Sequence, residues 1–202
     1  MKKSLLLLLL PFLCGCSEKE EPIGGPVIGP TYLIARYVEG DMKLDYIPRT
    51  AATDGKSNTL YIDWANNRFK SDGKLQSRVV YTNEEEGDIA ASAEEYIVFS
   101  SSALSLDRTR IYYQYLINVT DGVCRMTMTR IRYWYDENRD GGEKYTAEEW
   151  ITDDMALNKK KTKLAPICGK FRRETIDLKN QLFQSATDEL GQKVLANETT
   201  PA

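Results

Sequence analysis

The sequence predicts an α+β domain in which an antiparallel sheet surrounds a long central hairpin. Three observations lead to this class. Residues 109–135 form two runs rich in β-branched and aromatic residues around Asp121-Gly122, which is a strong hairpin signal. Apolar residues recur at helical spacing over residues 57–69 and again over residues 170–195. We therefore expect an early helix and a long C-terminal helix to cover one face of the sheet.

The register of the hairpin follows from its turn. A two-residue loop at Asp121-Gly122 pairs Thr120 with Val123, and counting outward sorts the side chains into an apolar face and a mixed, mostly polar face. A slip of one residue would mix the two faces, so we assign the apolar face to the core. The apolar pairs are Val119–Cys124, Ile117–Met126 and Tyr115–Met128; the mixed pairs are Asn118–Arg125, Leu116–Thr127 and Gln114–Thr129.

The remaining elements are expected from shorter patterns. Thr146 and Glu149 have capping-box spacing at the start of one expected helix. Strands are expected at 32–38, 42–47, 77–82, 88–92 and 95–99, and helices at 57–69, 146–157 and 170–195. The first helix depends on Leu60, Tyr61, Trp64, Ala65 and Phe69, and the last on the stripe Phe171, Leu178, Leu182, Ala186, Leu190 and Val194.

The N-terminus indicates export. Residues 1–15 carry two lysines and a short leucine-rich segment, which is too short to span a bilayer and is typical of a signal peptide. Leu13-Cys14-Gly15-Cys16 is similar to the lipobox of bacterial lipoproteins, so Cys16 is the expected site of lipid attachment. The alternative is an ordinary signal peptide that is cut near Gly15.

The segment after Cys16 is expected to connect the lipid to the fold. Residues 17–21 are mostly acidic and are similar to a surface-export signal, which favours an outer-membrane lipoprotein exposed on the cell surface over one facing the periplasm. Three prolines and three glycines in residues 22–30 disfavour a helix or a central strand. We expect a flexible tether at 16–30, one domain at 31–195 and a frayed tail at 196–202.

Together these parts resemble an uncharacterised domain family of Bacteroidetes lipoproteins with a TBP-like fold. The resemblance covers about residues 42–192 and is carried by Leu60-Tyr61 with Trp64 and Phe69, by the hairpin strands at 115–127, and by the closing helix after a proline-containing loop. The basic run at 159–163 and the loop at 136–142 depart from the family. The resemblance implies a TBP-like fold and no activity, since the family has no established catalytic residues. The fold name does not imply DNA binding.

Composition excludes several classes of function. Loss of residues 1–15 leaves 25 basic and 30 acidic residues, a net charge of −5 that argues against nucleic acid and against electrostatic binding to anionic lipid. The chain has no histidine, which excludes the usual Ser-His-Asp and Cys-His systems, and it has no glycine-rich nucleotide loop. We therefore expect a protein without cofactor or catalytic residues. The alternative is a hydrolytic enzyme that uses paired carboxylates.

Asp136 to Gly141 is similar to the first half of a calcium loop, with oxygen ligands at positions one, three and five and glycine at six. Position twelve, which requires a bidentate acid, is Ala147, and Glu148 lies one residue late. We expect a polar turn and no metal.

Two further sets of residues are candidates for function. The same register places Tyr112 and Tyr133 on the outer face of the hairpin, as a surface that could bind a glycan or an envelope protein. The alternative is that these aromatic pairs only stabilise the sheet. The full candidate binding surface on the outer face is Arg110, Tyr112, Gln114, Ile131 and Tyr133.

Cys124 is expected to be buried beneath the C-terminal helix and is a candidate for a disulfide with Cys168.

Overall fold

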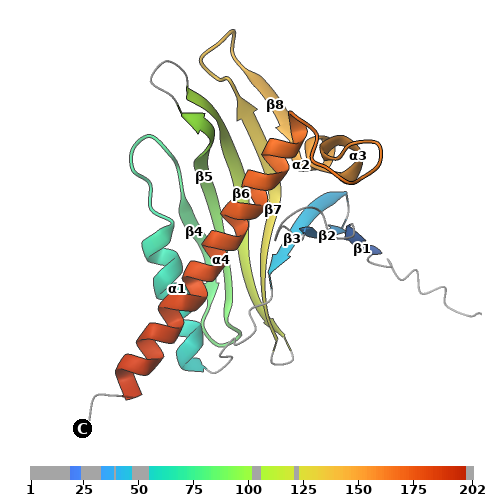
Figure 1. Cartoon of the computed structure of the whole chain (residues 1–202). Helices are drawn as coiled ribbons and strands as arrows, with labels where there is room; N and C mark the ends of the chain where they lie inside the picture. Colours follow the sequence, from blue (N-terminus) through green and yellow to red (C-terminus); the bar gives the residue numbers. More distant parts are fainter. Residues whose placement is uncertain are drawn as a thin grey trace, which may run out of the picture.

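The computed structural model describes residues 19–23, 33–38, 40–46, 55–101, 106–120 and 123–198. Its strands form one antiparallel sheet in the order β1-β2-β3-β7-β6-β5-β4, and β8 also pairs with β7 (Figure 1). The strands are β1 Lys19–Ile23, β2 Leu33–Val38, β3 Asp41–Tyr46, β4 Arg78–Asn83, β5 Asp88–Ser101, β6 Leu106–Thr120, β7 Val123–Tyr135 and β8 Glu143–Thr146. The helices are α1 Gly55–Arg68, α2 Ala147–Trp150, α3 Asp153–Ala156 and α4 Cys168–Glu198.

The central hairpin has the predicted register near its turn. Thr120 pairs with Val123, Val119 with Cys124 and Ile117 with Met126, as the sorting of apolar and polar side chains requires. Cys124, Met126 and Met128 are all buried on the same face. The prediction of a long β6–β7 hairpin with this register is confirmed, while the turn residues 121 and 122 lie outside the described part.

A β-bulge changes the register farther from the turn. The pairing shifts between Tyr112 and Gln114, so Tyr112 pairs with Arg132 and no longer with Ile131. Arg130 has a φ of 51°, in the left-handed region, at the extra residue of β7. Ile131 and Tyr133 consequently point into the core, where they are 0% and 1% exposed. The prediction that these two side chains lie on the outer face is therefore wrong.

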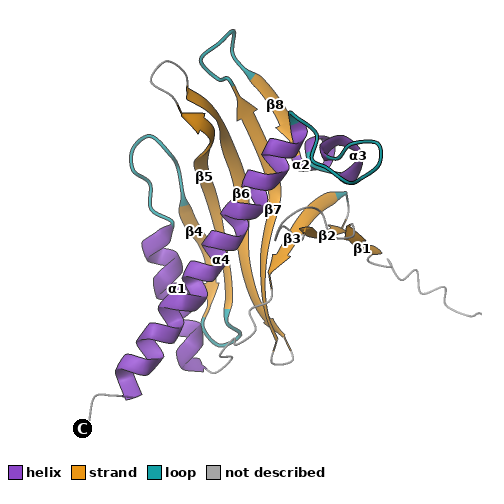
Figure 2. Ribbon diagram, in the orientation of Figure 1, coloured by secondary structure: helices purple, strands orange, loops and turns teal. Residues whose placement is uncertain are grey.

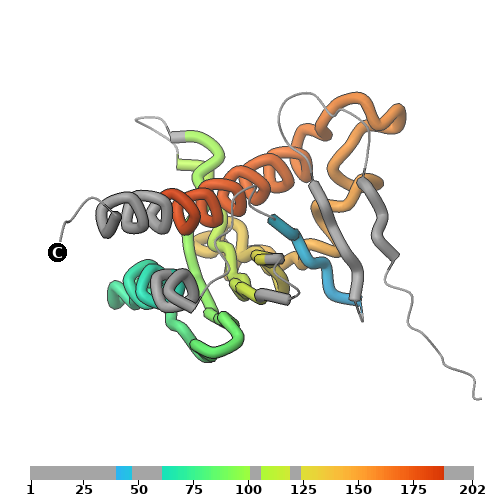
Figure 3. Tube along the Cα trace, turned by 90° about the horizontal axis from the view of Figure 1, so that it is seen from below, coloured from blue at the N-terminus to red at the C-terminus, as the bar shows by residue number. Residues whose placement is uncertain are grey.

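Helices α1 and α4 pack side by side against one face of the sheet (Figures 2 and 3). Tyr115 of β6 contacts rings from both, with centroid distances of 5.5 Å to Trp64, 5.0 Å to Phe69 and 5.0 Å to Phe183. Trp64 and Phe69 are thus core residues. The two-layer α+β architecture, with the early and late helices on one face, agrees with the fold class predicted from the sequence.

Helix α4 also carries the predicted apolar stripe, with Phe171, Leu182 and Ala186 buried. Three polar side chains beside the stripe are buried as well, which the periodicity does not predict: Arg172, Thr175 and Lys179. The side chains of Leu190 and Val194 lie outside the described residues. Among the helices that the structure describes, none combines the length and the apolar character that crossing a membrane requires.

Several boundaries differ from the sequence predictions. β5 is one continuous strand, whereas the sequence predicts two strands at 88–92 and 95–99. The helix expected at 146–157 is two single-turn helices, α2 and α3, and the first has the predicted capping box of Thr146 and Glu149. The sequence predicts a loop at 136–144, but residues 143 and 144 belong to strand β8. They form a strand because they pair with the outer part of β7.

The ends of the fold also differ. β1 lies within the segment predicted as a flexible tether and forms an edge strand on β2. An edge strand tolerates Pro22 because a missing backbone donor can face away from the partner strand. α4 continues to Glu198, beyond the predicted end of the domain at residue 195.

Cys124 and Cys168 are free thiols, and both are buried. Cys124 lies beside the β6–β7 turn, whereas Cys168 begins α4 near the opposite end of the sheet (Figure 1). The long helix therefore separates the two cysteines, and the candidate disulfide is not formed.

Candidate binding site on the outer sheet face

The outer face is the face of the sheet opposite α1 and α4. The bulge and the β7–β8 pairing align two rows of side chains across β6, β7 and β8 on this face. The first row is Arg110, Trp134 and Lys144; the second is Tyr112, Arg132 and Thr146. Residues 132 and 134, like 144 and 146, are two apart and therefore share a face.

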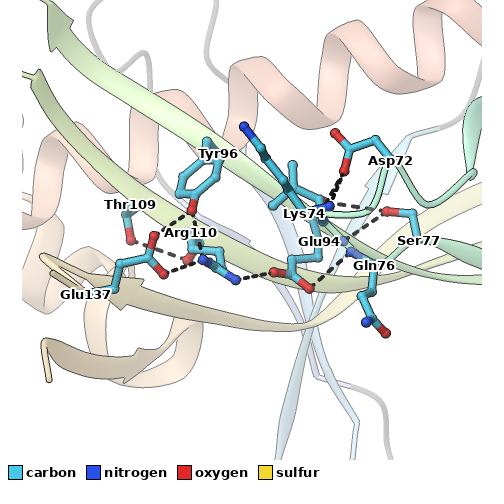
Figure 4. Close-up of polar contacts among 10 residues, drawn as sticks. Asp72, Lys74, Gln76, Ser77, Glu94, Tyr96, Thr109, Arg110 and Glu137 are labelled. Carbon is cyan, nitrogen blue, oxygen red and sulfur yellow. Dashed lines mark hydrogen bonds and ion pairs between the residues drawn. The ribbon is translucent and has the colours of Figure 1, made fainter.

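The Arg110 side chain is held in place on this face by two ion pairs and a hydrogen bond (Figure 4). Its guanidinium lies 2.6 Å from the Glu94 carboxylate and 2.6 Å from the Glu137 carboxylate, and it donates to the Tyr96 hydroxyl at 2.8 Å. Burial lowers the pKa of Arg110, but the bonds to Glu137 and Glu94 outweigh that effect and raise it above its ordinary value. Burial raises the pKa of Glu137, and hydrogen bonds from Tyr96 and Arg110 reverse this and lower it.

This cluster joins the loop after β7 to the sheet. Glu137 belongs to the calcium-like loop, yet its carboxylate accepts from the Tyr96 hydroxyl at 2.5 Å and pairs with Arg110. Among the described residues, no group of three acidic, cysteine or histidine side chains is placed to hold a metal ion. Through the side chain of Glu137, this loop therefore connects β5 and β6 to the end of β7.

Trp134 is fixed between two cations. Its indole nitrogen donates to the Gly141 carbonyl at 2.8 Å. The Arg110 guanidinium lies 5.4 Å and the Lys144 ammonium 4.9 Å from the indole centroid, within the range of cation–π interactions. Arg110 is held by its two carboxylates, whereas Lys144 is exposed.

A hollow of about 280 Å³ opens over these rows. Tyr133 and Tyr145 border it, but they pair with each other on the inner face, where Tyr145 stacks on Trp150 at 3.8 Å. The Glu149 carboxylate at its rim accepts from the Thr146 backbone and hydroxyl in the capping box. The other lining residues are Tyr112, Arg132, Trp134, Lys144 and Thr146.

A second hollow of about 570 Å³ adjoins the first and shares Tyr112, Arg132 and Thr146 with it. It is more polar, and its walls include Gln114 and Ser92. The two hollows together form a groove across the outer face, with Tyr112 and Arg132 at the junction.

The structure thus keeps part of the predicted surface and adds to it. Arg110, Tyr112 and Gln114 lie on the outer face as expected, although Arg110 is already bound to two carboxylates. Ile131 and Tyr133 lie in the core. The residues that sequence reasoning missed are Arg132, Trp134, Lys144 and Thr146.

A signal for these residues is present in the sequence. Strict alternation beyond Met128 would turn Arg130 and Arg132 into the core, which is unfavourable for unpaired charges. One extra residue in β7 restores an inward Ile131 and an outward Arg132. The proposed lipid site, Cys16, lies outside the described residues.

The arrangement of an antiparallel sheet with helices on one face and an open groove on the other defines a TBP-like α+β protein. A family described as "Domain of unknown function (DUF4468) with TBP-like fold" matches residues 58–134. The crystal structure of a DUF4468 family protein from Bacteroides ovatus ATCC 8483 is 37% identical, with a TM-score of 0.69, and the match covers 79% of this chain and 93% of that chain. The chain belongs to the DUF4468 family, which confirms the family and the TBP-like fold expected from the sequence.

A more distant match shows the same fold. The crystal structure of a TBP-like protein from Parabacteroides distasonis ATCC 8503 has a TM-score of 0.58 at 23% identity, covering 76% of this chain and 95% of that chain. No curated protein matches the chain. Fold and family are thereby established, and the function has to be argued from the site.

Proposed function

We propose that this protein is a lipid-anchored component of the cell envelope that binds a glycan in the groove of its outer face. The observation that carries the proposal is the 280 Å³ hollow, in which Trp134 and Tyr112 stand among polar side chains. Aromatic rings offer flat apolar surfaces, while Thr146 and Arg132 offer hydrogen-bonding groups beside them. A protein ligand on the same face is the alternative.

We favour binding over catalysis because the acids around the groove have other partners. Glu94 and Glu137 are paired with Arg110, and Glu149 caps α2. A hydrolytic enzyme based on carboxylates would need two acids that converge on one bond, about 5–10 Å apart. Acids that neutralise an arginine or cap a helix are poorly suited to exchange protons with a substrate.

The glycan proposal can be tested by titrating the detergent-purified protein with neutral and acidic oligosaccharides and measuring the heat of binding by calorimetry. Trp134→Ala should weaken binding at least tenfold, because it removes the largest ring of the hollow. Tyr81→Ala is the matched control, since Tyr81 is an exposed aromatic of β4 outside the hollow. Absence of binding to every oligosaccharide would reject a glycan ligand.

The membrane part of the proposal rests on the lipobox. Attachment at Cys16 would hold the domain at the outer membrane, on the cell surface or, as the alternative, facing the periplasm. Together with other envelope components, the lipid would provide the attachment that an acidic mature chain cannot obtain from anionic headgroups.

Cys16→Ala should abolish labelling with radioactive palmitate and move the protein out of the membrane fraction. Cys14→Ala is the matched control, because Cys14 would be removed with the signal peptide and its loss should leave labelling intact. Labelling of the Cys16→Ala variant would contradict the assignment. Protease treatment of whole cells would then distinguish surface display from a periplasmic orientation.

A further inference from the structure

We propose that the ligand of this groove is an acidic glycan, and that Arg132 and Lys144 together bind the carboxylate of one of its sugars. This inference rests on the proposed function and narrows it from glycans in general to those that contain uronic acids. It depends on three features. The two cations lie on adjacent strands, neither forms an ion pair with a carboxylate in the described part of the chain, and the Lys144 ammonium lies over the Trp134 ring.

The register places the two cations within reach of one anion. Arg132 pairs with Thr146 and Trp134 pairs with Lys144, so Arg132 and Lys144 are diagonal neighbours on β7 and β8. Diagonal neighbours on one sheet face lie roughly 7–8 Å apart at the backbone, which long side chains easily span. A planar guanidinium and a mobile ammonium can thus hold the two oxygens of one carboxylate between them.

Three other arginines of the outer face form ion pairs, and Arg108 lies over the Tyr96 ring, 4.0 Å from its centroid and outside both hollows. Arg110 binds Glu94 and Glu137, Arg125 lies 2.8 Å from Asp45, and Arg130 lies 3.8 Å from Asp41. Within the part of the chain that the structure describes, no carboxylate forms an ion pair with Arg132 or Lys144. These two cations are therefore the ones in the hollow that remain to neutralise a ligand.

Lys144 also links charge recognition to ring stacking. Its ammonium lies 4.9 Å from the centre of the Trp134 indole. Moving this ammonium to a sugar carboxylate would uncover the part of the indole that Lys144 covers, while the Arg110 guanidinium is held in place by its two carboxylates. The same sugar could then stack on the exposed ring. An acidic sugar would draw the Lys144 ammonium away from the ring by forming an ion pair with it, whereas a neutral sugar would have to displace the ammonium without such a gain.

The surroundings favour single carboxylates over a densely charged polyanion. Glu149 lies at the rim of the first hollow, and Asp41, Glu94 and Glu148 lie along the second. These acids would repel a continuous row of phosphates, and the mature chain carries a net charge of −5. Acidic sugars separated by neutral hydroxyl-rich surface fit this alternation of charge.

The test uses oligosaccharides in which glucuronic acid alternates with N-acetylglucosamine, and compares them with the same oligosaccharides after reduction of their carboxyl groups, using the detergent-purified full protein. We expect the acidic form to bind at least tenfold more tightly by calorimetry and to change tryptophan fluorescence. Arg132→Gln and Lys144→Gln should each reduce this preference about tenfold, which corresponds to roughly 1.4 kcal/mol. The charge-matched controls are Arg173→Gln on α4 and Lys160→Gln in the basic loop, which should leave the preference unchanged.

The possible outcomes distinguish the acidic-glycan inference from the proposed function of glycan binding. Equal binding of acidic and reduced oligosaccharides would overturn this inference while leaving glycan binding intact. If neither form binds, but neutral glycans of another class do, the inference also fails. If no glycan binds, the proposed function fails. Poly-L-glutamate or duplex DNA that binds as tightly as the alternating acidic oligosaccharide would show recognition of charge alone and would likewise overturn the inference.

Discussion

At the scale of single residues, the position of Trp134 depends on two glycines in the loop that follows it. Gly141 accepts the indole N–H through its carbonyl, and Gly142 lets the backbone pass close to the ring. A Cβ at Gly142 would lie 2.7 Å from the indole nitrogen and 2.6 Å from the Tyr135 carbonyl oxygen. Gly142 also has a φ of +67°, so both space and conformation require glycine there.

Gly142→Ala should therefore lower the free energy of unfolding by roughly 2–3 kcal/mol, because steric overlap adds to backbone strain. Gly141→Ala is the matched control. Gly141 has a φ of +84°, but a Cβ added there would meet nothing within 4 Å, so only strain of about 1 kcal/mol is expected. Urea unfolding measures both values. Equal losses in the two variants would show that the close approach of the backbone to Trp134 is unimportant.

Lys179 is the other residue whose surroundings determine its chemistry. Its side chain is buried in α4 with 3% exposure, and its ammonium donates to the Asp45 carbonyl at 3.1 Å. Burial lowers its pKa to about 8, although the negative charge of Asp45 acts in the opposite direction. The charged form is therefore less favourable in the folded protein than in the unfolded chain.

This shift predicts how stability depends on pH. The folded pKa is about 8 and the unfolded value is about 10.4, so the destabilisation by Lys179 is complete below pH 8 and disappears as the pH rises through 10. The shift corresponds to an effect on the order of 3 kcal/mol. Lys179→Met removes this dependence, so its stability relative to wild type should be higher at pH 7 than at pH 10. Urea unfolding at both values, with Lys170→Met as control, tests this; a difference independent of pH would refute it.

At the scale of elements, the β7 bulge decides which side chains face the groove. The Asp-Gly turn and the two-residue alternation correctly predict the inner half of the hairpin. Alternation alone cannot reveal a bulge, since the extra residue only changes the phase of the pattern that follows it. For this reason the alternation places Ile131 and Tyr133 on the wrong face and misses Arg132 and Trp134.

Arg130 is where this phase change occurs, and its φ of 51° gives a direct test. Arg130→Gly should stabilise the protein by about 0.5–1 kcal/mol relative to Arg130→Ala, because glycine adopts positive φ without strain. Arg130→Ile should be less stable than Arg130→Ala by at least about 1 kcal/mol. The alanine variant accounts for loss of the exposed pair with Asp41. Stabilities in the reverse order would argue against the bulge at this position.

Other elements show what local patterns leave out. The sequence predicts two strands in place of β5 and leaves Ala93 and Glu94 between them, yet pairing with β6 carries the strand through that point. β8 is short and polar, and it exists because the outer part of β7 offers an unpaired edge. Such elements are determined by tertiary pairing, which a single sequence does not display.

At the scale of the whole molecule, the sequence correctly predicts the layers because periodicity reports directly on which faces are buried. It does not predict the distance between Cys124 and Cys168, since that depends on the direction in which α4 crosses the sheet. Both thiols are buried, and burial raises the pKa of Cys124 to about 11.

We therefore expect the melting temperature of the protein to be the same with and without a reducing agent. A thiol reagent at pH 8 should label Cys124 and Cys168 only after unfolding, because the reactive thiolate of a buried cysteine with a raised pKa is scarce. Cys168→Ala serves to assign the labelled sites by mass spectrometry. A drop in melting temperature on reduction would indicate a disulfide.

The strand order also constrains how the chain folds. β4, β5, β6 and β7 are consecutive in the sequence and adjacent in the sheet, so this meander needs only short loops to close. β3 is different, because the Asp45 carboxylate meets the Thr127 hydroxyl across 82 positions of the chain. Closing such a long loop is entropically costly, so we expect the local pairings to form before β3 docks on β7. The apolar side chains of Met42 and Leu44 therefore stay exposed until β7 has been synthesised and can pair with β3. During this interval of biogenesis the first strands of the chain are prone to aggregation.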